Sequence, residues 1–344
     1  MEHHRTRINL QAVYRVAELA DLTVPFALRV VADLRVADQL TDGPRTVEEL
    51  AAATQTHAPS LHLALRALAC KGIFSEVEPG RFGLTPMAEL LTSDHPLLLR
   101  EGLSVVKSDL MAWSAVEHSL RTGEPAFDHV HGRPYWEYMA DHPEDNERFN
   151  LSQEVMTRLE LLTVPRSYNW TDAKSVVDIG GGNGAFLAGL LSRFKRMRGV
   201  LVDLPHVVEG AQRVLEKAGV ADRCEVIPGG YLESVPHGHD VYLLKRVLWG
   251  ISDARARKLL RAIRGAMRTD SRLLILEPPR QPGDAFDVAK ISDLRLLVLG
   301  GHGSRTREEL DALFADTDLT LTNQFSARFL SIVEARARAA LAAA

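Results

Sequence analysis

The feature that most constrains this chain is a glycine-rich turn directly after a short apolar run, in the sequence VVDIGGGNG at residues 176–184. The β-branched and apolar residues before the turn predict a buried strand, and Ala185–Ala188 after it predicts the start of a helix. Glycine permits a tight turn with positive φ and lets a ligand approach the backbone amides. A strand, a glycine turn and a helix in this order predict a nucleotide-binding site.

Two acids accompany this turn. Asp178 lies near the end of the predicted strand, and Asp203 ends a second apolar run, Gly199–Val202, about 20 residues beyond the glycines. An acid at the end of the second strand can accept hydrogen bonds from both hydroxyls of a ribose. The alternative is a glycine turn with a purely structural role, but the second acid favours a nucleoside site.

The chain beyond residue 175 alternates between strand-like and helical stretches, which predicts an α/β fold with a doubly wound parallel sheet. The last two predicted strands are separated by about five residues, and connections this short join antiparallel neighbours. We therefore expect seven strands, the last of them antiparallel. The predicted strands cover residues 176–179, 200–203, 224–228, 241–244, 272–277, 319–323 and 329–334.

Residues 1–100 predict helices and one small hairpin. Thr46 and Glu49 form a capping box, and we expect Ser60 to cap the helix that follows it. A helix, a turn, a second helix and a hairpin are typical of a winged-helix domain. The predicted helices cover residues 9–37 with an interruption at Pro25, 47–53 and 61–71, and the hairpin strands cover residues 73–77 and 81–84.

A winged helix can bind DNA, but two observations oppose that function. The formal net charge is −4, whereas nucleic-acid surfaces are basic. The second helix is mostly Leu and Ala apart from His62, Arg66 and Lys71, which favours packing against other elements. We expect no nucleic-acid partner.

The middle of the chain predicts further helices. Leu97–Thr122 predicts one long helix, residues 125–138 predict a loop rich in aromatic residues and His, and Arg148–Arg166 predicts a helix leading into the second domain. His129 and His131 are two residues apart, and no further Cys or His follows at metal-ligand spacing. We therefore interpret them as solvated histidines and expect no metal site.

The remaining composition favours a cytoplasmic protein without membrane contact. Cys70 and Cys224 lie in apolar surroundings and imply no disulfide framework. The first ten residues contain no apolar core of a signal peptide, and no run approaches the 18 or so apolar residues of a membrane span.

The motif at residues 178–184, together with the sequence Asp203-Leu204-Pro205, resembles that of S-adenosylmethionine-dependent O-methyltransferases acting on small, mostly aromatic molecules. The resemblance covers nearly the whole chain. It implies a Rossmann-like seven-stranded methyltransferase domain at residues 171–340 and a winged-helix dimerisation domain at residues 1–100. It further implies that helices within residues 101–170 line the pocket, and that the chain forms a homodimer whose first domain helps to roof the partner's active site.

The resemblance also assigns residues to S-adenosylmethionine and to its product, S-adenosylhomocysteine. The glycine turn would hold the methionyl part, Asp203 the ribose, and Lys245 would lie near the methionyl carboxylate. Tyr231 would lie beside the adenine, and Gly230 stands where the family has an acid. The implied set is Asp178, Gly180, Gly182, Asp203, Leu204, Gly230, Tyr231 and Lys245.

A nicotinamide-dependent dehydrogenase is the rival interpretation from fold class. Its glycine spacing is satisfied if the motif begins at Gly180 and ends at Ala185 as Gly-x-Gly-x-x-Ala, so the motif alone does not exclude it. The sequence offers one sheet without a second mononucleotide-binding half, which favours the methyltransferase.

The chain departs from the family at the catalytic segment. The family has His-Asp-Trp after the fourth strand, whereas this chain, aligned on Lys245 and Asp253, has Trp249-Gly250-Ile251. Of the two Glu residues that support the family's His, Glu277 matches the first, and Ser304 replaces the second. The base and one of its supports are therefore both missing.

This loss affects how the acceptor can react. Ionising a phenol at pH 7 costs about 4 kcal/mol, and a positioned base contributes roughly 10²–10⁴-fold. Methyl transfer by proximity and orientation alone remains open, since positioning supplies several kcal/mol. His302 and Glu277 are candidate substitute bases, and Trp249 can either pack or stack on a planar substrate.

Two further interpretations stay open. The chain could bind S-adenosylmethionine and direct a hydroxylation, decarboxylation or cyclisation, or it could be a non-catalytic dimeric binding protein. The intact cofactor residues oppose the last of these. For an O-methyltransferase, the acceptor implied by the resemblance is a hydroxylated aromatic or polyketide-type molecule of an antibiotic-type pathway, either free or tethered to a carrier protein.

Overall fold

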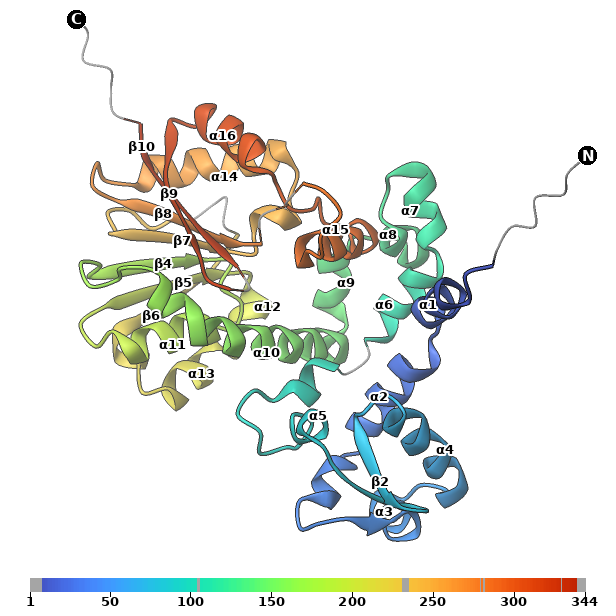
Figure 1. The fold of residues 1–344 in the computed structure, drawn as a ribbon. Coiled ribbons are helices and arrows are strands. Elements are labelled where there is room, and N and C mark those ends of the chain that lie inside the picture. Colours follow the sequence, from blue (N-terminus) through green and yellow to red (C-terminus); the bar gives the residue numbers. More distant parts are fainter. Residues whose placement is uncertain are drawn as a thin grey trace, which may run out of the picture. The chain divides into compact units, whose positions relative to one another are not determined.

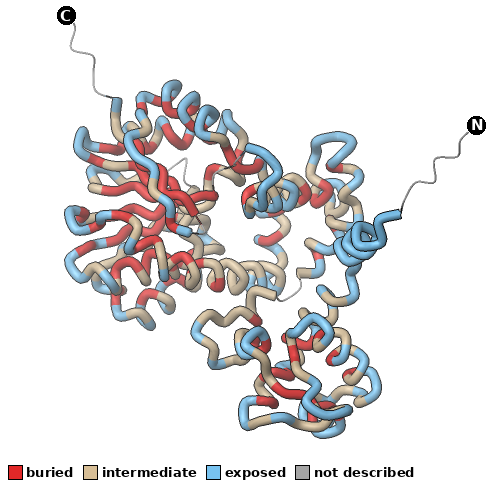
Figure 2. The backbone as a smooth tube through the Cα atoms, in the orientation of Figure 1, coloured by how far each residue is buried: buried red, intermediate tan, exposed pale blue. Residues whose placement is uncertain are grey.

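The computed structural model describes residues 8–103, 106–230, 235–278, 280, 282–328 and 330–338. The chain divides into two compact units, Met1–Val105 and Val106–Ala344. Figure 1 shows the elements of each unit, and Figure 2 shows that buried residues in the second unit concentrate on its central strands.

The first unit contains helices around a three-stranded antiparallel sheet of order β1-β3-β2, whose β2 and β3 form the predicted hairpin. Its core is built from the inward faces of these elements and includes Leu50, Leu65, Leu68, Phe74 and Phe82. The elements are α1 (Leu10–Ala20), α2 (Thr23–Asp33), η1 (Ala37–Leu40), β1 (Arg45–Thr46), α3 (Val47–Thr54), α4 (Ala58–Ala69), β2 (Phe74–Glu78), β3 (Arg81–Leu84), α5 (Pro86–Glu89) and η2 (Leu99–Leu103).

Local capping signals had mixed outcomes in this unit. The capping box of Thr46 and Glu49 is present as predicted. The prediction that Ser60 caps the next helix is wrong, because α4 begins at Ala58 with Pro59 in its first turn. The first helical stretch breaks before Thr23, and Pro25 lies in the first turn of α2, where its missing N–H costs little.

The second unit begins with five helices: α6 (Lys107–Ser114), α7 (Val116–Thr122), α8 (Ala126–His131), α9 (Tyr135–Asp141) and α10 (Pro143–Ser167). The prediction of one helix over residues 97–122 is wrong, since the helix breaks at Ala115. The loop predicted over residues 125–138 is also wrong. Its aromatic residues form a packed cluster instead, with the ring centroids of Phe127 and Tyr135 4.8 Å apart, and this packing stabilises two short helices.

The seven-stranded sheet has the order β6-β5-β4-β7-β8-β10-β9. Strands β4 to β8 are parallel, whereas β10 runs antiparallel to both β8 and β9, so the expected topology is confirmed. The strands are β4 (Ser175–Ile179), β5 (Arg198–Asp203), β6 (Cys224–Pro228), β7 (Val241–Lys245), β8 (Arg272–Glu277), β9 (Leu319–Ser326) and β10 (Ser331–Ala337).

Helices cover both faces of this sheet, and a separate apolar cluster fills each side. A capping box of Thr306 and Glu309 opens α16. The connecting elements are α11 (Ala185–Arg193), α12 (Pro205–Val208), α13 (Ala211–Lys217), η3 (Ala221–Arg223), η4 (Leu248–Gly250), α14 (Asp253–Ala266), α15 (Val288–Leu299) and α16 (Arg307–Ala315).

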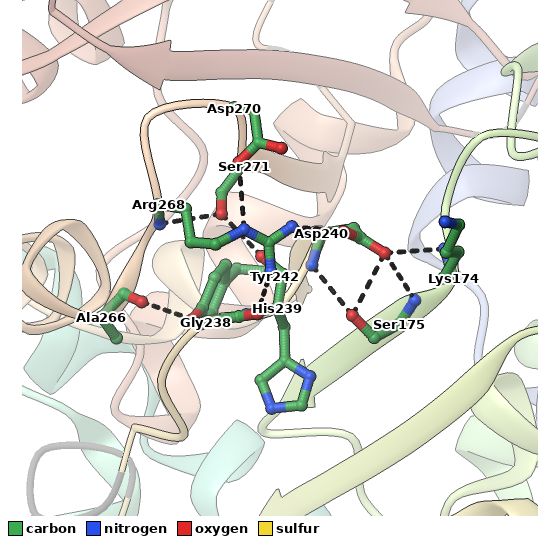
Figure 3. A network of polar contacts seen from close by, with 10 residues as sticks. All are labelled: Lys174, Ser175, Gly238, His239, Asp240, Tyr242, Ala266, Arg268, Asp270 and Ser271. Carbon is green, nitrogen blue, oxygen red and sulfur yellow. Dashed lines mark hydrogen bonds and ion pairs between the residues drawn. The ribbon is translucent and has the colours of Figure 1, made fainter.

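A polar network holds the amino ends of the central strands together (Figure 3). Asp240, just before β7, accepts hydrogen bonds from the backbone amides of Lys174 and Ser175 at 2.7 and 2.9 Å. Arg268 forms an ion pair with the other oxygen of Asp240, and the Tyr242 hydroxyl donates to a backbone carbonyl in the same region. This network lies at the edge of the sheet opposite the glycine turn.

Candidate functional site

The glycine turn follows β4 at the carboxyl edge of the sheet and adopts a backbone that requires glycine. Gly180, Gly182 and Gly184 have φ values of 72°, 64° and 79°. A Cβ at Gly180 would lie 2.7 Å from Cγ2 of Val247, so this position also needs a small residue. At Gly182, by contrast, no described atom lies within 4 Å of the Cβ position, so the turn presents its backbone to open space there.

Asp203 joins the turn to the end of β5. Its Oδ2 accepts a hydrogen bond from the Gly182 amide and its Oδ1 accepts one from the Leu204 amide, both at 2.7 Å. Burial raises the pKa of Asp203, and these two amides act in the opposite direction. The predicted residues from two strands therefore meet at one edge, and each carboxylate oxygen retains a further acceptor position.

Asp178 is the buried acid of the site, with 0% of its surface exposed. Among the described residues, neither carboxylate oxygen has a hydrogen-bond partner. Burial raises the pKa of Asp178 to about 7, although the positive charge of Lys245 opposes this effect. A buried carboxylate without donors is costly, so this site is suited to a ligand that brings a positively charged donor.

Lys245 ends β7 and pairs with a buried acid of α10. Its Nζ lies 3.3 Å from Oε2 of Glu160, a residue with 0% exposure, and 3.4 Å from Oγ1 of Thr157. The same ammonium lies 5.5 Å from the ring centroid of Phe186. Glu160 was not among the site residues predicted from the sequence. Gln153, Thr157 and Glu160 recur at spacings of four and three, which is the signal of one polar helix face.

Arg246 carries the second cation on Glu160. It forms an ion pair with Oε1 of Glu160, and its Nη1 lies 3.4 Å from Oε1 of Gln153. Its guanidinium lies 5.7 Å from the ring centroid of Trp249. The Arg246 backbone has a φ of 59°, a left-handed conformation that is uncommon for a residue with a side chain.

Trp249, which the resemblance aligns with the family's His, lies in η4, and both its backbone amide and its carbonyl are hydrogen-bonded. Its amide donates to Oε1 of Glu277 at 3.1 Å, and its carbonyl accepts from the amides of His302 and Gly303 at 3.0 and 2.8 Å. Burial raises the pKa of Glu277 to about 7, opposed by the amides of Trp249 and Leu248 and by nearby arginines. Glu277 therefore holds the backbone of this turn.

Arg305 clamps the same turn from the other side, and sequence reasoning assigned it no role. Its side chain is buried and donates to the carbonyls of Leu248 and Ile251 at 2.5 and 2.7 Å, and to Oδ1 of Asp253 at 3.0 Å. The amide and the hydroxyl of the neighbouring Ser304, which the resemblance aligns with the family's second Glu, both donate hydrogen bonds to the Asp293 carboxylate.

Two further predicted positions lie at the margin of the site. The His302 residue is exposed, and partial burial together with the Arg305 guanidinium lowers the pKa of its imidazole. The amide of Gly229 donates to the carbonyl of Asp203 at 2.9 Å, which places Gly230 near the end of β5. Tyr231 lies outside the described residues.

The described residues contain no candidate metal centre and no candidate membrane span. No group of three or more His, Cys, Asp or Glu side chains in this part of the chain could hold a metal ion. Across the same residues, no helix is both long and apolar enough to cross a membrane.

Family models match most of the chain. An O-methyltransferase domain matches residues 113–318, and an O-methyltransferase dimerisation domain matches residues 17–94. The chain belongs to the O-methyltransferase family. The first match includes the glycine turn, Asp203 and the Trp249 turn, so the O-methyltransferase domain contains every element of the site described above.

Two bacterial enzymes are similar to this chain over most of its length. A phenazine O-methyltransferase from Lysobacter antibioticus is 40% identical over 312 residues, which cover 90% of this chain and 92% of that protein. An aclacinomycin 10-hydroxylase from Streptomyces purpurascens is 34% identical over 314 residues, which cover 89% of this chain and 84% of that protein. The family relatives therefore include both a methyltransferase and a hydroxylase.

A solved O-methyltransferase from neocarzinostatin biosynthesis shares the fold. It superimposes with a TM-score of 0.80 at 32% identity, covering 96% of this chain and 99% of that one. That protein was crystallised in complex with S-adenosylmethionine and 2-hydroxy-5-methyl naphthoic acid.

Proposed function

We propose that this O-methyltransferase transfers a methyl group from S-adenosylmethionine to a hydroxyl of an aromatic or polyketide-type small molecule. The observation that carries the proposal is Asp178, fully buried beside the glycine turn with two oxygens that lack donors in the described structure. Relatives that act on a phenazine, or that bind a hydroxylated naphthoic acid, support the aromatic acceptor.

The residues at the carboxyl edge of the sheet fit this cofactor, which when bound supplies an electrophilic methyl group on a sulfonium. Asp178 would accept the methionyl ammonium, and Lys245 would attract the methionyl carboxylate. The open backbone at Gly182 lets the ligand approach, with Gly180 shaping the turn. Asp203 would accept from the ribose hydroxyls, next to the Leu204 amide.

The adenine end of the cofactor would lie beyond β6. Gly230 would contribute only its backbone there, and we assign the aromatic contact to Tyr231 from the resemblance. The helices within residues 101–170 would line the acceptor pocket. The polar face of α10, which carries Glu160 toward Lys245 and Arg246, supports that role.

Catalysis would rest on proximity and orientation, because Trp249 replaces the family's base. We propose that the Trp249 indole positions a planar acceptor, and that Glu277 holds the turn that presents this indole. Glu277 and His302 are the two alternative candidates for a substitute protein base.

The test is methyl transfer from methyl-labelled S-adenosylmethionine to hydroxyarenes such as 1-hydroxyphenazine and a hydroxynaphthoic acid. Each acceptor would be offered free and as a carrier-protein thioester where its carboxylate allows. We expect label on the acceptor oxygen, with calorimetry showing S-adenosylhomocysteine binding to the same preparation. An unchanged rate for His302→Ala would exclude the imidazole as base. Failure to bind S-adenosylhomocysteine would overturn the site assignment.

A second candidate function is cofactor-dependent hydroxylation, favoured by the 34% identical aclacinomycin 10-hydroxylase and by the absence of the family's His. Mass spectrometry of products formed with oxygen and a thiol reductant separates the two functions. A product that gains an oxygen atom and no label supports the hydroxylase, whereas a labelled methyl ether supports the methyltransferase.

A further inference from the structure

The turn that lacks the family's His carries a buried cation next to it. We infer that Arg246 stabilises the ionised hydroxyl of the acceptor and thereby supplies what a general base would otherwise provide. This inference rests on the proposed methyl transfer, and it assigns to that site the residue that makes its acceptor reactive.

The position of Arg246 is the first support. Its guanidinium lies 5.7 Å from the ring centroid of Trp249, so the cation and the indole share one part of the site. The Arg246 side chain is only 12% exposed. Its buried Nε finds no hydrogen-bond partner among the described residues, so one N–H remains to be satisfied. An acceptor oxygen placed by Trp249 would satisfy it.

The surrounding charges are the second support. Glu160 on α10 pairs with both Arg246 and Lys245, so this group of one anion and two cations carries a net positive charge. Across the site, Asp178 on β4 and Glu277 on β8 both have a pKa near 7, because burial disfavours their ionised forms. The Arg305 cation is balanced by Asp253. With the ligand bound, Asp178 would be paired with the methionyl ammonium, and Glu277 is only partly ionised near pH 7, so neither carboxyl group strongly opposes an added anion.

The backbone of Arg246 is the third support. A positive φ is sterically unfavourable for any residue with a Cβ, and residues held in such conformations gather at functional sites. The ion pair with Glu160 and the Arg246 amide, which donates to the Leu276 carbonyl at 3.1 Å, hold this conformation in place. The strained backbone directs the guanidinium toward α10 and Trp249.

The reaction balances without a protein base. The acceptor O–H releases its proton to water, and Arg246 holds the resulting oxyanion while remaining protonated throughout. The oxyanion would then form a C–O bond to the methyl carbon of bound S-adenosylmethionine as the C–S bond breaks, and the electron pair of that bond would stay on sulfur as a neutral thioether. The rate should therefore follow ionisation of the bound acceptor rather than that of a protein group.

The experiment titrates 1-hydroxyphenazine bound to the full chain with S-adenosylhomocysteine, using the absorbance change of its ionisation. We expect the pKa of the bound phenol to lie about 1–2 units below that of the free phenol, because a cation lies next to it. Arg246→Gln should raise this bound pKa by about one unit, whereas Arg246→Lys should retain most of the lowering. The matched control is Arg257→Gln, which removes a cation of α14 that is paired with Asp316.

Removing Arg246 alone leaves Glu160 as a buried anion, which can destabilise the fold. The double variant Arg246→Gln, Glu160→Gln removes both charges and is the variant to use if the single one does not fold. A bound phenol that titrates at the wild-type pH in folded Arg246→Gln, or at the same pH in the double variant as in Glu160→Gln alone, overturns the inference.

This titration involves no turnover, so the inference and the proposed function fail separately. A lowered phenol pKa that depends on Arg246, without methyl transfer to any acceptor, would refute the proposed function alone. Methyl transfer with a phenol pKa unaffected by Arg246→Gln would refute the inference alone. In methylation assays, the Arg246→Gln rate should fall about tenfold at pH 6.5 and approach the wild-type rate once the acceptor is fully ionised.

Discussion

At the scale of the residue, Asp178 shows how burial changes the behaviour of one side chain. Its folded pKa of about 7 lies above the ordinary value of 3.8, so the protonated form is favoured in the folded chain. The folded state therefore binds more protons than the unfolded state between these values, and Asp178 lowers the stability of the ligand-free protein as pH rises toward 7. A bound ammonium reverses this preference, since it favours the carboxylate.

We predict that affinity for S-adenosylhomocysteine weakens as pH falls below about 7. The ligand's ammonium requires the ionised Asp178, so the apparent Kd should rise by up to about tenfold per pH unit. Asp178→Asn should bind more weakly at pH 8 and lose most of this pH dependence. Calorimetry across pH 5.5–8.5 measures both, and an unchanged pH profile in Asp178→Asn would assign the effect to another group, such as Asp203.

Some residues of the site could be predicted from the sequence and others could not, for a physical reason. The positions of Asp178, Gly180 and Asp203 at the carboxyl edge of the sheet could be predicted because each lies at a strand end with a local pattern of its own. The helical spacing of Gln153, Thr157 and Glu160 indicates a shared polar face, but it does not reveal the partner of Glu160, because Lys245 lies 85 residues further along the chain and meets it only through the packing of α10 onto the sheet. Arg305 was missed because its acceptors are backbone carbonyls, which carry no sequence signal.

At the scale of the element, η4 is a three-residue turn that depends on side chains from elsewhere. Glu277 on β8 binds its amides, and Arg305 binds the carbonyls of Leu248 and Ile251. Such a short turn cannot hold its own conformation, so these partners determine where Trp249 points. The helices α8 and α9 likewise depend on contacts that lie outside their local sequence patterns. Contacts among aromatic residues stabilised helices where local patterns predicted a loop.

We predict that Arg305→Met lowers the free energy of unfolding by about 2–4 kcal/mol, because two carbonyls of the turn lose their donors inside the protein. The substitution retains much of the side-chain volume, so the effect measures hydrogen bonds more than packing. Urea denaturation followed by circular dichroism is the measurement. The control is Arg257→Met, whose ion pair with Asp316 is more exposed and should contribute less than about 1 kcal/mol.

At the scale of the whole molecule, α1 is a helix whose apolar side chains remain exposed in the single chain. All of its residues are exposed, including the large apolar side chains of Leu10, Val13, Tyr14, Val16 and Leu19. A helix of 11 residues is marginal in water without packing. Together with the matched dimerisation domain, this surface supports a homodimer in which α1 is covered.

We predict that Val13→Glu converts a dimer into a monomer or weakens its association by more than tenfold, because it places a charge in the covered apolar surface. Light scattering coupled to size-exclusion chromatography measures the mass over a dilution series. Gln11→Glu adds the same charge to the same helix at a polar position and should leave the mass unchanged. A wild-type chain that elutes as a monomer at every concentration would contradict the homodimer.

The polar network around Asp240 lies at the amino ends of β4 and β7, whereas the residues proposed to bind ligand lie at the carboxyl ends of the strands. The two groups of residues do not overlap, so the network can keep the strands aligned independently of the residues at the opposite edge. Substitutions near Asp240 should therefore shorten the lifetime of the folded chain, and those near Trp249 should alter which acceptors react. Durability and substrate range can change independently in this protein, since they depend on opposite edges of one sheet.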